Sequence, residues 1–135
     1  MNYYIASGLE NAKRVNLAAG ALSRHTHAYD WTAHGDIRRE GPDRMRQVSS
    51  NELQAVVSAD LVVFLLPGGK GTHSELGAAL ASGRGKRINL WSETGDEFRA
   101  GEGETHPSVG AFYFHPHAER WCCGFDALLE RLGAI

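Results

Sequence analysis

The feature that most constrains the fold is an unbroken apolar run at residues 61–66, which reads L-V-V-F-L-L. This run is far shorter than the roughly 20 residues that a membrane helix needs, but it is typical of a central parallel strand covered on both faces. Apolar residues at helical spacing precede the run at residues 47–59, and a glycine-rich turn follows it. The run therefore predicts an α/β domain with this strand at the centre of its sheet.

The rest of the chain alternates between strand-like and helix-like periods. Predicted strands cover residues 2–7, 28–32, 61–66, 87–91 and 109–114, and predicted helices cover residues 9–23, 47–59, 72–82 and 125–132. Residues 34–46 are expected to form a surface loop, and residues 92–108 either a mobile lid or a disordered segment. This alternation predicts a three-layer flavodoxin- or Rossmann-like fold with five parallel strands. With 135 residues, the chain is expected to form one domain, residues 1–135.

Composition excludes several classes of function. Fourteen Lys and Arg against sixteen Asp and Glu give a net charge of −2, so no global basic field attracts a nucleic acid polymer. No membrane helix and no charged-then-apolar leader are visible, and we expect a cytoplasmic protein. Cys122 and Cys123 are adjacent, match no zinc motif, and are expected to be buried and reduced. The seven histidines match no metal motif either, so we expect neither a metal nor a cofactor.

Ligands of parallel α/β sheets bind beyond the carboxyl ends of the strands, so candidate residues follow the predicted strands. The densest candidate is the segment Pro67–Gly77, which reads P-G-G-K-G-T-H-S-E-L-G. Its glycines permit close approach of the backbone to a ligand, and the amides of the following helix start suit phosphate or sugar oxygens. The candidate binding residues are Ser7, Gly8, Asp30, Trp31, Gly68, Gly69, Lys70, Gly71 and His73.

Glu75 has two interpretations. Thr72 and Glu75 form a T-x-x-E pattern, which is typical of a capping box at a helix start. Alternatively, the helix dipole and nearby amides keep a first-turn carboxylate ionised at neutral pH, as a nucleophile requires. Asp60 begins the central strand at the opposite edge of the sheet, and we assign it a structural role.

The segment Gly71–Gly77 resembles the nucleoside 2-deoxyribosyltransferase family, whose nucleophilic glutamate lies in a G-x-x-x-E-L-G context. The resemblance extends from Asn2 to about Trp91, and it implies that Glu75 is the catalytic nucleophile. It further implies that Tyr4, on the opening strand, lies near the sugar and the nucleophile. Glu52 occupies the place of an aspartate that assists the leaving base in that family, and the longer side chain leaves its role open.

The same loop also resembles the P-G-G-x-G-T-x-x-E signature of the cytokinin-activating nucleoside 5′-monophosphate phosphoribohydrolases, although the catalytic arginine context of those longer chains is not evident. Enzymes of both families cleave a base from a sugar. The implied mechanism is attack by Glu75 on C1′ of a nucleoside or nucleoside 5′-monophosphate, giving a glycosyl-enzyme that passes the sugar to water or to another base. A nucleotide-binding or sensing domain without catalysis is the alternative from another class.

Several residues keep two interpretations. Trp31 either stacks on a base or packs in the core, and Asp30 either binds the ligand or caps a turn. Four arginines of the loop region either clamp a 5′-phosphate or are simply solvated: Arg38, Arg39, Arg44 and Arg46. Because related families complete their sites with a neighbouring subunit, the resemblance implies a homodimer or larger homo-oligomer, and Phe112–His115 is the segment expected to contribute.

Overall fold

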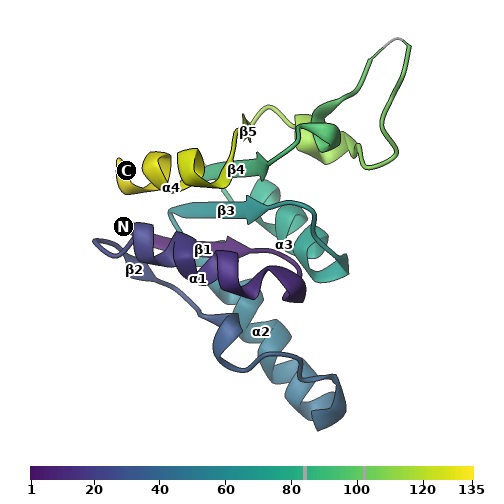
Figure 1. Ribbon diagram of the computed structural model, residues 1–135. Helices are drawn as coiled ribbons and strands as arrows, with labels where there is room; N and C mark the ends of the chain where they lie inside the picture. Colours follow the sequence, from purple (N-terminus) through teal and green to yellow (C-terminus); the bar gives the residue numbers. More distant parts are fainter. Residues whose placement is uncertain (84, 102) are drawn as a thin grey trace.

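The computed structural model describes residues 1–83, 85–101 and 103–135, and Figure 1 shows a parallel β-sheet between helices. The strands are β1 (Asn2–Ala6), β2 (Thr26–His27), β3 (Leu61–Leu65), β4 (Arg87–Ser92) and β5 (Ala118–Cys122). They pair in the order β2-β1-β3-β4-β5, and every pair is parallel. This is the strand order of a flavodoxin-like sheet, so the predicted fold class is confirmed.

Four α-helices cover the sheet: α1 (Ala12–Ala21), α2 (Pro42–Ser58), α3 (Lys70–Ala81) and α4 (Phe125–Gly133). α1 packs against α4 on one face, and α2 packs against α3 on the other (Figure 1). No helix in the described part of the chain has the length and apolar character needed to cross a membrane.

The central strand β3 is buried along its whole length, as its apolar sequence predicts. Each of its neighbours, β1 and β4, presents buried residues to the same core. Asp60 precedes β3 and accepts a hydrogen bond from the Asn2 backbone N–H at 2.8 Å. Asp60 therefore joins β1 to the start of β3, in agreement with its structural assignment.

The predicted strand at residues 28–32 is wrong. β2 contains only Thr26–His27, and residues 31–33 form a 3-10 helix that Asp30 caps by accepting from the Thr32 N–H at 3.0 Å. A carboxylate two residues before a backbone amide offers the chain a turn in place of a ladder hydrogen bond. This local bond outweighs the strand-like alternation of Tyr29 and Trp31.

The predicted last strand is also misplaced. Residues 111–114 form a 3-10 helix, η5 (Ala111–Phe114), and β5 lies at Ala118–Cys122. β5 is an edge strand with Glu119 and Arg120 exposed, so its sequence lacks the apolar alternation of a covered strand. Both cysteines are free, but Cys122 is exposed, which corrects the expectation that both thiols are buried.

Two connecting segments contain more regular structure than the sequence suggests. α2 begins at Pro42 rather than near residue 47, with proline at the first helical position, where its missing N–H is not needed. Within residues 92–108, β4 extends to Ser92 and a 3-10 helix, η4, covers Asp96–Phe98. The part of that prediction that concerns residue 102 lies outside the described residues.

Candidate active site

A cleft of about 650 Å³ opens at the carboxyl ends of β1 and β3. Neighbouring strands at this point send their connections to opposite sides of the sheet, which is where ligands of such folds bind. Nine of the residues predicted from the sequence line it: Ser7, Gly8, Trp31, Glu52, Gly68, Gly69, Lys70, Gly71 and Glu75.

Two walls of different character face each other across the cleft. The α3 wall comprises residues 68–75, that is, the glycine loop after β3 and the start of α3. The α2 wall comprises residues 31–52, from the 3-10 helix η2 (Trp31–Ala33) to the middle of α2. The cleft-lining residues of the α2 wall include four apolar side chains: Trp31, Ile37, Met45 and Val48.

Within the α3 wall, Gly68 packs tightly against Thr72. A Cβ atom at Gly68 would lie 2.4 Å from the Thr72 Cγ2 atom, and Thr72 is only 4% exposed. α3 begins at Lys70 with Gly69 as its N-cap residue, and no side chain caps it. The capping-box interpretation of Thr72 and Glu75 is therefore wrong, because both residues lie inside the helix.

Glu75 is a partly buried residue at the wall of the cleft. Burial raises its pKa, which the neighbouring Tyr4 hydroxyl lowers and the Glu52 carboxylate raises further, to about 7. This corrects the expectation that the helix start keeps the carboxylate fully ionised at neutral pH. Its buried Oε2 atom has no hydrogen-bond partner among the described residues. Near pH 7, Glu75 therefore interconverts between a proton carrier and a poorly solvated carboxylate.

Tyr4 lies beneath the cleft on β1 and is completely buried. Burial raises the pKa of its hydroxyl group, and the carboxyl groups of Glu75 and Glu52 raise it further. The hydroxyl makes no hydrogen bond of standard geometry with a described residue, yet it is close enough to Glu75 to lower the pKa of that carboxyl. Tyr4 thus keeps its proton and offers it toward the carboxyl pair.

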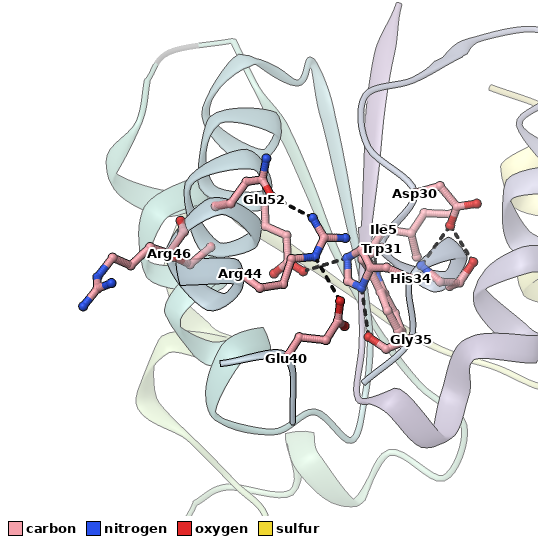
Figure 2. A network of polar contacts seen from close by, with 12 residues as sticks. Ile5, Asp30, Trp31, His34, Gly35, Glu40, Arg44, Arg46 and Glu52 are labelled. Carbon is pink, nitrogen blue, oxygen red and sulfur yellow. Dashed lines mark hydrogen bonds and ion pairs between the residues drawn. The ribbon is translucent and has the colours of Figure 1, made fainter. Parts of the chain in front are cut away.

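Glu52 lies on α2, across the cleft from the glycine loop, and is close to His34. The Glu52 Oε1 and His34 Nε2 atoms are 3.9 Å apart, and His34 Nδ1 lies 2.9 Å from the Gly35 carbonyl oxygen (Figure 2). Because a carbonyl only accepts, Nδ1 carries the hydrogen, and Nε2 faces Glu52. Burial raises the pKa of Glu52, and His34 partly offsets this.

Sequence reasoning did not single out His34. Its position just beyond a predicted strand is the available signal, but no metal motif includes any of the histidines, and its pairing with Glu52 is a long-range contact.

Other predicted residues do not line the cleft. Asp30 caps the η2 3-10 helix, and His73 contacts Gly69 and Tyr113 instead. Trp31 lines the cleft but is 5% exposed, and its Nε1–H donates to the Ile5 carbonyl at 2.8 Å, as Figure 2 shows.

Three of the four arginines of the α2 wall form local ion pairs. Arg38 lines the mouth of the cleft but pairs with Asp36 at 2.6 Å. Arg46 pairs with Asp43 at 2.6 Å, and in Figure 2 it points away from the His34–Glu52 pair. These contacts match the solvated interpretation. Arg44 likewise pairs with Glu40, and Arg39 is an exposed residue outside the cleft lining.

Comparison with known proteins gives a likeness of structure only. No protein-family model matches the sequence, and no curated protein matches it. Among solved structures, the chain is similar to the Clostridium botulinum CMP N-glycosidase BcmB, with a TM-score of 0.65, 17% sequence identity, and coverage of 98% of each chain. At this identity the likeness establishes the fold, which the two chains share over nearly their whole lengths.

Proposed function

We propose that this protein is an N-glycosidase that cleaves the bond between base and sugar in a nucleoside 5′-monophosphate. The observation that carries the proposal is Glu75, a partly buried carboxyl with a pKa of about 7 at the wall of a cleft beyond the central strand. The resemblance of its G-x-x-x-E-L-G context to nucleoside 2-deoxyribosyltransferases supports it, as does the structural likeness to a CMP N-glycosidase.

In the first step, a Glu75 oxygen attacks C1′ while the N-glycosidic bond breaks and its electron pair leaves with the base. The transition state resembles an oxocarbenium ion, which a nearby carboxylate stabilises. A carboxylate that has lost its solvent shell is a stronger nucleophile and forms an ester with the sugar. Tyr4, next to Glu75, donates toward the carboxylate or the sugar ring and so helps to orient it.

The departing base needs a proton, and the His34–Glu52 pair supplies it. Nδ1 of His34 donates to the Gly35 carbonyl, and Nε2 lies 3.9 Å from Glu52 Oε1, a distance longer than a hydrogen bond. Whichever of Nε2 and the Glu52 carboxyl carries the proton, the pair faces the α2 side of the cleft and acts as the general acid. In the second step the same pair, now without the proton, accepts one from the water that attacks C1′ and frees Glu75.

In this proposal the α2 wall contacts the base of the substrate, and the glycine loop of the α3 wall contacts its sugar and phosphate. The apolar residues of the α2 wall suit the flat face of a base. Ser7, Gly8 and the loop from Gly68 to Gly71 offer backbone amides and Lys70 to the sugar and its 5′-phosphate. This placement puts C1′ between Glu75 and the His34–Glu52 pair.

The test is incubation of the purified protein with ribo- and deoxyribonucleosides and their 5′-monophosphates, followed by chromatography for free base. We expect base release in plain buffer from a 5′-monophosphate, and no release by Glu75→Gln. Glu130→Gln, at an exposed position on α4, is the matched control and retains activity. Release that requires an added acceptor base indicates transfer instead of hydrolysis. Binding without release, unchanged by Glu75→Gln, indicates a sensing domain and refutes the proposal.

A further inference from the structure

His73 lies two residues before Glu75 on α3, yet its ring contacts protein atoms rather than the cleft. Its Nδ1 atom is 2.7 Å from the Gly69 carbonyl oxygen, and its Nε2 atom is 2.6 Å from the Tyr113 hydroxyl oxygen. A carbonyl only accepts, so Nδ1 donates, and Nε2 of the neutral ring accepts from the Tyr113 O–H. The imidazole thus links the glycine loop to the η5 helix, 40 residues further along the chain.

The link fixes the direction of one peptide plane. The Gly69 carbonyl accepts from the His73 side chain and also from the His73 backbone N–H at 3.2 Å. In a trans peptide the N–H points opposite to the C=O, so the Lys70 N–H points away from the body of α3. The amides at a helix start have no partner within the helix, and Gly69 and Lys70 both line the cleft. Holding the carbonyl therefore fixes the orientation of this free amide at the edge of the cleft.

Tyr113 is a firm anchor for this link. It is 5% exposed, its ring lies edge-on to Phe98 at 6.2 Å, and its carbonyl accepts from Arg120 Nη1 at 3.1 Å. Burial raises the pKa of its hydroxyl, and Glu97 raises it further, so the hydroxyl keeps its proton and remains a donor. Through His73, the η5 helix between β4 and β5 thus supports the glycine loop.

We propose that His73 is a positioning residue: held by Tyr113, it orients the Gly69–Lys70 peptide so that its amide binds the sugar-phosphate part of the substrate. The identity of that ligand rests on the proposed function, whereas the link between Tyr113, His73 and Gly69 does not. The effect should appear in substrate affinity, because the amide contacts a part of the substrate that does not react.

The first test compares two tyrosine-to-phenylalanine variants. Tyr113→Phe removes the anchor hydroxyl and should raise KM about three- to tenfold, the range for one lost hydrogen bond, with kcat within about twofold. Tyr3→Phe is the control, because Tyr3 is 3% exposed and its hydroxyl donates to the Ala19 carbonyl at 3.4 Å, outside the cleft lining. An unchanged KM for Tyr113→Phe, or equal changes in the two variants, would overturn the proposal.

Substitutions at His73 separate the two halves of the link. His73→Asn keeps a donor near the Gly69 carbonyl but loses Tyr113, so it should match Tyr113→Phe. His73→Ala loses both contacts and should raise KM more, and adding Tyr113→Phe to it should change nothing further. Additive effects of the two substitutions contradict a shared link. A fall in kcat at constant KM contradicts a role in binding.

Nuclear magnetic resonance tests the link without any turnover. We expect His73 to show the Nδ1–H neutral tautomer near pH 8, and the Lys70 and Gly71 amides to gain motion in Tyr113→Phe but not in Tyr3→Phe. If no nucleotide is cleaved but these results hold, the proposed function fails and the link stands. An Nε2–H tautomer, or unchanged loop motion, refutes the link whatever the enzyme does.

Discussion

The α3 wall and the α2 wall of the cleft differ in how their side chains are supported. Glu75 lies within the regular helix α3, which follows the central strand β3 after the glycine loop. The lining residues of the α2 wall are spread over two 3-10 helices, a loop and the first two-thirds of α2. The α3 wall therefore takes its residues from one loop and one helix, whereas the α2 wall combines residues of a helix with residues of irregular segments.

The strongest test of the difference between the two walls is to remove the Glu75 carboxylate of the α3 wall. Glu75→Gln should lower kcat at least about 1,000-fold, because no other group forms the ester. In the wild type, kcat/KM should fall below about pH 7, where Glu75 becomes protonated and ceases to be a nucleophile. Initial rates of base release between pH 5 and 9 check both. A residual rate within tenfold of the wild type would remove Glu75 from the chemistry.

The same substitution should stabilise the protein above pH 7. The pKa of Glu75 is about 7 when folded, against 4.5 for an ordinary glutamate, so the folded state binds the proton more tightly. Stability from this carboxyl is complete below pH 4.5 and is lost as the pH rises through 7. Glu75→Gln should therefore raise the free energy of unfolding by up to about 3 kcal/mol at pH 8 and by little at pH 4. Denaturant titrations at both pH values measure this, and an equal effect at both would contradict it.

On the α2 wall, Glu52→Gln should lower kcat about 100-fold for an ordinary base, since a general acid of this kind is lost. The loss should shrink for 7-methylguanosine 5′-monophosphate, if it is a substrate, because its cationic base leaves without a proton. Glu52→Asp should retain more activity than the glutamine variant. Steady-state kcat values with both nucleotides test this prediction. An equal loss of kcat with the two nucleotides would argue against proton donation by the His34–Glu52 pair.

The smallest effect is expected at the apolar part of the α2 wall. Met45→Ala should raise KM about threefold and leave kcat unchanged, because this half-exposed side chain contributes only contact area. Leu53→Ala is the control, as Leu53 is 49% exposed against 45% for Met45, lies on the same helix, and is not part of the cleft lining. Equal KM values in the two variants would show that the base does not lie against Met45.

The two walls also differ in how well the sequence predicts them. The apolar run of β3 and the glycine loop after it specify their own conformations, so the position of Glu75 follows from local pattern alone. The protonation state of Glu75 does not follow, because it depends on burial and on Tyr4 and Glu52, which come from other elements.

The α2 wall was less predictable for reasons that particular residues explain. The Asp30 carboxylate accepts a hydrogen bond from the Thr32 N–H, so a 3-10 helix forms where a strand is predicted. Gly41-Pro42 resembles a helix-breaking pair, but Pro42 is the first residue of α2. The pairing of His34 with Glu52 joins two residues that are 18 positions apart and lie in different elements, so no local pattern reveals it.

The close packing of Gly68 on Thr72 makes two adjacent glycines unequal in their tolerance of mutation. A methyl group at Gly68 would overlap the buried Thr72 side chain, whereas a methyl group at Gly69 would meet no heavy atom within 4 Å. In a library randomised over this loop and selected for folded protein, the first position should return glycine almost alone and the second should accept small residues. In related sequences this loop should therefore keep glycine at position 68, while position 69 can change and alter the surface of the cleft.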